Sequence, residues 1–87
     1  MSTAAAPLNV RVLLFASYAD LLGREALQVT LPRPATIASL LERVRALPGG
    51  AALPPRPLCA RNLAHVGIDA PLDDGDEVAL LPPLAGG

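Results

Sequence analysis

The last two residues of the chain, Gly86 and Gly87, are the ones whose type and position could do chemistry. Glycine has no side chain to block entry into a narrow channel, and its backbone takes up almost any φ and ψ. Such an end presents one carboxylate at its tip, so the atom predicted to react is the C-terminal carbon of Gly87. A diglycine end can also have no function, so the other residues must be considered as candidates for the reactive group.

Side chains elsewhere in the sequence offer no complete catalytic or metal site. His65 is the only histidine and Cys59 the only cysteine, which together are too few ligands for zinc. Ser17 and Ser39 lack the glycine context of a nucleophile elbow, so no catalytic triad is predicted. Cys59 lies in an apolar stretch and is expected to be a small buried hydrophobe. His65 is expected to lie on the surface or in an interface.

The charged residues exclude some functions and leave others open. The formal net charge is −1 and the arginines are scattered, which argues against nucleic acid as a partner. Lysine is absent, so no side-chain amine is available for a Schiff base or for isopeptide attachment to this chain. Most of the acidic residues fall between residues 69 and 77, but their order does not match a calcium loop. They indicate a solvated turn around Gly75 or an acidic docking patch.

The hydrophobic pattern predicts strands and two helices. Strands alternate apolar and polar residues and are expected at residues 8–15, 25–31, 58–61, 63–66 and 77–81. A short helix is expected at residues 16–22 with Gly23 as its stop, and the main helix at residues 37–47, capped by Thr36 and halted by Pro48. Asn62 suits a turn between the two short strands. Residues 48–57 are rich in proline and glycine and are expected to form an irregular surface loop.

This element order predicts an α+β fold, in which one main helix packs across a mixed sheet. The first strand becomes wholly apolar at its far end, which is therefore expected to be buried on both faces. The last strand is apolar from Val78 to Leu81 and is expected in the centre of the sheet, with a partner protein as a possible cover for its second face.

One domain is expected, at residues 8–83, with a disordered lead-in at residues 1–7 and a flexible tail at residues 84–87. No apolar run is long enough to span a bilayer, and residues 1–7 lack the features of a signal peptide. The sequence therefore favours a cytoplasmic protein.

Two segments carry a family resemblance. They read VLLFASYADLLG at residues 12–23 and LDDGDEVALLPPLAGG at residues 72–87. The second is the more specific, because it combines a GDEVA strand, a double proline and a terminal diglycine. Both segments resemble the small subunits of molybdopterin synthase, the MoaD type of the MoaD/ThiS sulfur carriers. The resemblance covers about residues 8–87 and implies the ubiquitin-like β-grasp fold.

The resemblance also implies a mechanism for the tail. In this family an E1-like activating enzyme uses ATP and Mg²⁺ to adenylate the terminal glycine, and a sulfur donor converts the adenylate into a thiocarboxylate. The thiocarboxylate then gives sulfur to precursor Z, cyclic pyranopterin monophosphate, inside the large subunit of molybdopterin synthase. The resemblance implies that Gly87 carries the sulfur, that Leu84, Ala85 and Gly86 insert into the partner, and that no cofactor is bound permanently. Catalytic residues are then expected on the large subunit, in an assembly that is usually a heterotetramer, so the chain is not an enzyme on its own.

The expected contact with the large subunit includes residues that depart from the family pattern. It comprises Phe15, His65, Leu80, Leu81, Pro82 and Pro83. Family members commonly have an aromatic pair where this chain has Leu80 and Leu81, and an aliphatic residue where it has His65. Three alternatives stay open: a sulfur carrier for thiamine or cysteine synthesis, a ubiquitin-like protein modifier joined to lysines through Gly87, and a plain interaction domain with an idle tail.

Overall fold

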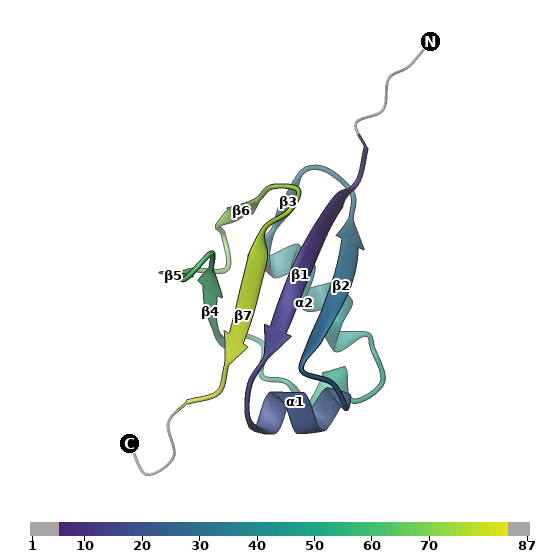
Figure 1. Cartoon of the computed structure of the whole chain (residues 1–87), viewed down its shortest axis with the longest axis vertical. Helices are drawn as coiled ribbons and strands as arrows, with labels where there is room; N and C mark the ends of the chain where they lie inside the picture. The colour runs from purple at the N-terminus through teal and green to yellow at the C-terminus, as the bar shows by residue number, and fades with distance from the viewer. Residues whose placement is uncertain (1–5, 84–87) are drawn as a thin grey trace.

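The C-terminal strand lies in the middle of the main sheet. The computed structural model describes residues 6–83, so the predictions for residues 1–5 and 84–87 fall outside the described part of the chain. The main sheet has five strands, with helix α2 (Ile37–Arg45) behind them in Figure 1. In spatial order the strands are β2 (Ala26–Leu31), β1 (Leu8–Leu14), β7 (Glu77–Leu81), β4 (Leu58–Arg61) and β5 (Ala64–Val66).

Strand pairing makes this sheet mixed. β1 runs antiparallel to β2 but parallel to β7, and β4 runs antiparallel to both β7 and β5. On the face of the sheet that points away from α2, Leu13 pairs with Ala79, Ala79 with Ala60, and Ala60 with His65. The predicted mixed sheet with a central last strand is confirmed.

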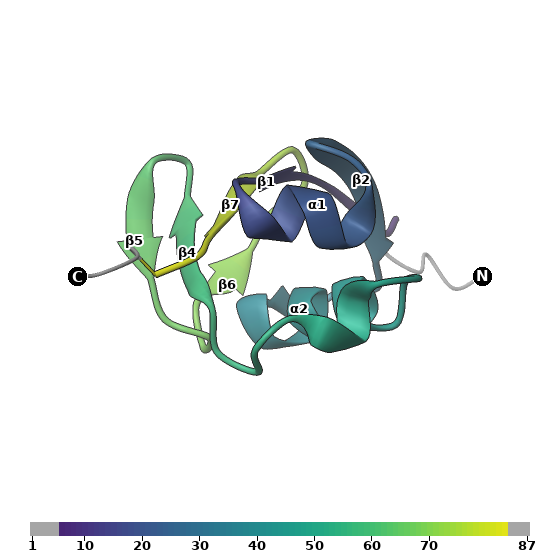
Figure 2. The same cartoon turned by 90° about the horizontal axis from the view of Figure 1, so that it is seen from below.

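One face of the sheet packs against α2 and forms the core. Alternate residues of β1, β2 and β7 are buried, and Figure 2 shows α2 on this side of the sheet. Side chains with no exposed surface are Val10, Val12, Ile37, Leu40, Val44, Val78 and Leu80. No polar or charged side chain is buried within residues 6–83. Apolar burial, worth about 25 cal/mol per Å², is therefore the main source of stability in this part of the chain.

Local chemistry sets the end of α1 and the start of α2. Helix α1 (Ser17–Leu22) ends at Gly23, whose φ of 71° is left-handed, as predicted for a glycine stop. Thr36 caps α2 with a reciprocal pair of hydrogen bonds, because the Ser39 N–H donates to the Thr36 hydroxyl (3.3 Å) and the Thr36 N–H donates to the Ser39 hydroxyl (2.8 Å). The helix ends earlier than predicted, so Leu47 lies beyond it and is 36% exposed.

The prediction of an irregular surface loop at residues 48–57 is wrong in part. The segment contains the single-turn helix η1 (Gly50–Ala52), and Leu53 is only 2% exposed. A side chain at Gly49 would lie 2.0 Å from the Leu21 carbonyl oxygen, and one at Gly50 would lie 2.1 Å from the Val44 carbonyl oxygen. The two glycines thus allow the segment to pack directly on the backbones of α1 and α2.

A second, smaller sheet joins the predicted polar turn to the residues just before α2. Strands β3 (Ala35–Thr36) and β6 (Pro71–Leu72) pair antiparallel, and Leu72 is buried. Two-residue strands are too short to produce an alternating pattern, so they were not predicted from the sequence. Within residues 6–83, no helix is long and apolar enough to cross a membrane.

Candidate functional site

An apolar patch lies on the outer face of the sheet, which no element in residues 6–83 covers. This outer patch consists of Leu13, Phe15, Leu58, Ala60, Ala79 and Leu81. Phe15 is 45% exposed and Leu58 55% exposed, and the other members are half-buried. The expectation that the first strand is buried on both faces at its far end is therefore wrong. The helix covers one face only, and the opposite face is apolar at this end of the sheet.

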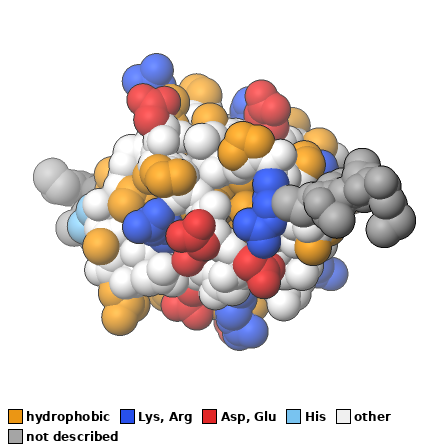
Figure 3. Space-filling model, turned by 90° about the horizontal axis from the view of Figure 1, so that it is seen from above, with side chains coloured by type: hydrophobic (Ala, Val, Ile, Leu, Met, Phe, Trp, Pro, Cys, Tyr) orange, Lys and Arg blue, Asp and Glu red, His pale blue; other side chains and the backbone are white. Residues whose placement is uncertain are grey.

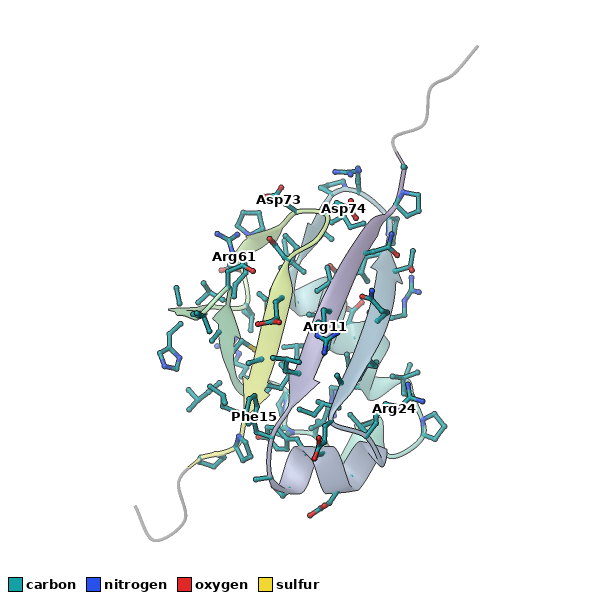
Figure 4. All side chains as sticks on the ribbon, viewed as in Figure 1. Arg11, Phe15, Arg24, Arg61, Asp73 and Asp74 are labelled. Atoms are coloured by element: carbon teal, nitrogen blue, oxygen red, sulfur yellow. The ribbon has the colours of Figure 1, made fainter. Side chains whose placement is uncertain are left out.

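The chain leaves the sheet beside this patch. β7 ends at Leu81, which pairs with Leu58, and Figure 4 shows Phe15 near the same end of β7. Pro82 is half-buried and Pro83 is exposed, and Pro83 is the last described residue. A proline pair has fixed φ angles and no N–H to donate, so the sheet cannot continue through it. The described part of the chain therefore ends next to exposed apolar side chains.

A hollow of about 400 Å³ lies beside Phe15 at the ends of β1 and β2. Its lining includes Arg11, Leu13, Glu25 and Ala26. Arg11 and Glu77 form an ion pair across β1 and β7 (3.9 Å) on the same outer face, where both side chains are exposed enough for water to screen the pair. A protruding side chain of another protein could pack into this hollow beside the outer patch.

Four of the six predicted contact residues lie together at the patch. These are Phe15, Leu81, Pro82 and Pro83. His65 is exposed on β5 and pairs with Ala60, which places it at the outer margin of the patch. The prediction for Leu80 is wrong, because this side chain is 0% exposed and lies on the core face of β7. Successive residues of a strand point to opposite faces, so Leu80 and Leu81 cannot both meet a partner.

Sequence reasoning missed Leu58 as a member of the patch. It is the first residue of a short strand and more than half exposed, and it becomes part of the patch only through its pairing with Leu81. The available signal was its apolar type at a position that alternates with the buried Cys59. The predicted tail residues Leu84, Ala85, Gly86 and Gly87 lie outside the described residues, so their roles stay predictions.

Cys59 is a core residue, as predicted. Its side chain is 3% exposed, and its thiol donates to the Pro57 carbonyl oxygen (3.4 Å). Burial raises the pKa of the Cys59 thiol from 9.0 to about 11. Burial also raises the pKa of Tyr18, with a smaller contribution from Cys59. A thiol that stays protonated is a poor nucleophile, so Cys59 is not suited to hold or transfer sulfur.

The raised thiol pKa predicts a loss of stability in alkaline solution. The folded chain keeps the Cys59 proton to a higher pH than the unfolded chain does. The contribution of the neutral thiol is therefore fully present below pH 9.0 and is lost as the pH rises towards 11. Urea unfolding on both sides of pH 9.0 should show this fall for the parent chain and a shallower one for Cys59→Ala, in which Tyr18 still titrates. Equal slopes in the two proteins would contradict the assignment.

The acidic residues before β7 hold their own turn together. The Asp74 carboxylate accepts a hydrogen bond from the Asn9 N–H (2.7 Å), and the Asp76 carboxylate accepts one from the Asp73 N–H (2.8 Å). Gly75 supplies the bend with a φ of 88°. Within the described residues, no three His, Cys, Asp or Glu side chains are grouped so as to hold a metal ion.

Comparison with known proteins places this geometry in a family. The family model described as "ThiS family" matches residues 12–87. The molybdopterin synthase sulfur carrier subunit of Escherichia coli (strain K12) is 38% identical over 81 residues, which cover 90% of this chain and 99% of that protein.

Two solved structures have the same fold as this chain. SAMP1 of Haloferax volcanii, a small archaeal modifier protein, has a TM-score of 0.79 at 27% identity and covers 91% of this chain and 99% of its own. The putative molybdopterin converting factor, subunit 1, of Pyrococcus furiosus has a TM-score of 0.77 at 25% identity and covers 88% and 99%. The predicted ubiquitin-like β-grasp fold is confirmed, and the chain belongs to the ThiS/MoaD family of sulfur carriers.

Proposed function

We propose that this chain is the sulfur-carrier subunit of a molybdopterin synthase. The observation that carries the proposal is the exit of the chain from the central strand β7, through Pro82 and Pro83, beside an uncovered apolar patch. A carrier needs an end that enters a partner's active site and a surface that docks on that partner. The similarity to the Escherichia coli sulfur carrier subunit supports this pathway.

The reacting group in this proposal is the carboxylate of Gly87. A carboxylate is a poor electrophile, because its negative charge repels nucleophiles. An activating enzyme that uses ATP and Mg²⁺ would join the carboxylate oxygen to AMP and release pyrophosphate. Sulfide from a donor would then attack the acyl carbon, and AMP would leave. The product is a thiocarboxylate, which is anionic and nucleophilic without help from a neighbouring base.

Sulfur transfer would take place inside the large subunit. The thiocarboxylate of Gly87 would give its sulfur to precursor Z, and water would return Gly87 to a carboxylate. The four residues after Pro83 span about 13 to 14 Å when extended, which is enough to enter a neighbouring pocket. The proline pair restricts the base of this segment and so reduces the entropy lost when it inserts. Catalytic side chains would come from the large subunit.

Mass spectrometry tests the proposal directly. The chain is incubated with the activating enzyme, Mg-ATP and a sulfide source, and its intact mass is measured. Replacement of one oxygen by sulfur at the C-terminus is expected, and the loaded chain should then form the dithiolene when mixed with the large subunit and precursor Z. Absence of the sulfur-bearing species would exclude every sulfur-carrier function. Loading without dithiolene formation would instead favour a carrier for thiamine or cysteine synthesis.

A second candidate function is that of a protein modifier. It is favoured by the similarity to SAMP1 of Haloferax volcanii, a small archaeal modifier protein. In that case the activated Gly87 would be attacked by a lysine amine of a target, with release of AMP and formation of an isopeptide bond. Isopeptide-linked adducts in cells, found by mass spectrometry after digestion, would support this function.

Truncation of Phe15 tests the role of the outer patch. We expect Phe15→Ala to weaken binding of the large subunit by about 2 kcal/mol, or roughly thirtyfold in Kd, because an exposed aromatic side chain at a patch centre is a typical hot spot. Isothermal titration calorimetry measures the loss. The matched control is Leu47→Ala, which removes a 36% exposed leucine from the helix side of the molecule. Equal losses in both variants, or none in Phe15→Ala, would show that the patch is not the docking surface.

A further inference from the structure

Leu63 is the most exposed large apolar side chain in residues 6–83. It is 93% exposed and forms, with Asn62, the two-residue turn between β4 and β5. Both turn residues have left-handed backbones, with φ values of 49° and 75°. Such hairpin turns favour Asn followed by Gly, because a side chain at the second position is strained. The chain thus places a leucine where glycine is expected.

Hydrogen bonds hold the turn in this conformation. The Asn62 N–H donates to the Glu77 carbonyl oxygen (2.8 Å), and the Glu77 N–H donates to the Asn62 side-chain oxygen (3.0 Å). The Asn62 side-chain nitrogen donates to the Asp76 carboxylate (3.0 Å). The tip of the hairpin is therefore fixed to the start of β7. Leu63 gains almost no burial in return for its strain, and strain that the fold does not use points to a function.

The position of Leu63 makes it a contact point separate from the tail. β4 is antiparallel to β7, so the hairpin lies at the start of β7 and the tail follows its end. Five strand residues hold these two places about 13 Å apart. A row of paired residues, Ala79, Ala60 and His65, crosses the sheet between them. A partner that covers the outer patch and this row lies next to the turn that carries Leu63, because His65 and the turn belong to the same short hairpin.

Charge indicates the kind of surface that Leu63 meets. Asp73, Asp74 and Asp76 lie at the same end of the sheet, and Arg61, whose guanidinium donates to the Pro71 carbonyl oxygen, is the nearest cation in sequence. Figure 3 views this end and shows its acidic and basic side chains. Arg11 at this end is paired with Glu77, and the remaining carboxylates of Asp73, Asp74 and Asp76 outnumber Arg61, so a partner surface with basic side chains around an apolar socket is complementary to it.

We propose that Leu63 is a second anchor for the large subunit, which receives it in an apolar socket bordered by arginine or lysine. This inference rests on the proposed function. A stable subunit contact buries roughly 800 Å² per partner, and a contact that extends from the outer patch along the sheet to the hairpin adds the exposed Leu63 side chain to this area. An activating enzyme that contacts only the tail and the patch would not depend on Leu63.

Two substitutions at Leu63 test the anchor. Leu63→Asn keeps the turn, since asparagine tolerates a left-handed backbone, but removes the apolar side chain. Leu63→Met keeps an apolar side chain of similar size. We expect Leu63→Asn to weaken binding of the large subunit at least tenfold or so, the effect of losing one buried leucine. Leu63→Met and the remote control Leu47→Gln should stay within about threefold of the parent chain.

The parent chain and the Leu63 variants also test the anchor separately from the proposed function. Calorimetry with the large subunit gives each Kd, and intact mass after incubation with the activating enzyme, Mg-ATP and a sulfide source gives loading, which Leu63→Asn should leave unchanged. A parent chain that does not bind the large subunit overturns the proposed function and the anchor together. A parent that binds, with Leu63→Asn as tight as Leu63→Met, overturns the anchor alone. Equal loss of loading and binding in Leu63→Asn would also overturn it, because the large subunit would not be the selective partner.

Discussion

Deletion of Gly87 is expected to abolish sulfur loading and to leave the fold unchanged. The deletion moves the terminal carboxylate back by one residue, about 3.5 Å, and a misplacement of 1 Å at a reacting centre can already cost about a hundredfold in rate. The last strand ends at Leu81, so the unfolding midpoint in urea should equal that of the parent chain. Intact-mass analysis after incubation with the activating enzyme, Mg-ATP and a sulfide source measures loading.

Two companion variants show which property of the tail matters. Deletion of Ala85 shortens the tail by the same length but keeps the diglycine end, whereas Gly86→Ala keeps the length and adds one methyl group. If reach decides, the two deletions fail alike and Gly86→Ala is loaded. If passage through a narrow channel decides, Gly86→Ala fails as well. Loading of the Gly87 deletion at the parent rate would remove Gly87 from the mechanism.

Gly50→Ala is expected to destabilise the fold by about 3 kcal/mol, through overpacking of a site with no room for a side chain. The added methyl carbon would lie 2.1 Å from the Val44 carbonyl oxygen and 2.9 Å from the Arg45 Cα. These are backbone atoms of α2, which cannot move aside as a flexible side chain would. The helix or the η1 segment has to shift, and the packing of Leu53 is lost with it.

Urea unfolding of Gly50→Ala and Gly67→Ala measures this cost against a matched control. A side chain at Gly67 would meet nothing within 4 Å, and its backbone is not left-handed. Gly67→Ala should therefore change the unfolding free energy by less than about 0.5 kcal/mol. Similar values for the two variants would mean that residues 48–57 do not pack tightly on α2.

Local patterns in the sequence predicted the main elements well. The strand at residues 77–81 is observed with those bounds, because four apolar residues in a row between an acidic turn and a proline pair leave few alternatives. The Thr36 cap was also predicted, since Thr36 directly precedes the apolar stripe of α2. The bounds of this strand and the helix cap depend on residues that are adjacent in the sequence, so a single sequence is enough to predict them.

Features that depend on distant pairing were missed or misassigned. Leu80 and Leu81 look alike in the sequence, and only the side on which α2 packs decides that Leu80 is buried. Leu58 joined the patch through its pairing with Leu81, and β3 was found only through its pairing with β6. The packing of Gly49 and Gly50 on two helices was hidden by a composition that is typical of loops.

The candidate site was predicted more fully by resemblance than by pattern. Spacing and composition pointed to the Gly87 carboxylate mainly by excluding His65 and Cys59 as catalytic groups. The prediction that Phe15 and His65 contact a partner came from the family resemblance, and both side chains are exposed. Leu63 had no such signal, because its left-handed backbone is a property of the folded hairpin.

The parallel pairing of β1 with β7 has a mechanical consequence. The start of β1 and the end of β7 lie at opposite ends of adjacent strands, so tension between the two chain ends runs along the strands. The hydrogen bonds between β1 and β7 are evenly spaced, so they share this force and do not break one after another. A pull on the end of β7 against the start of β1 therefore loads these hydrogen bonds together, and the central pair of strands resists it as one unit.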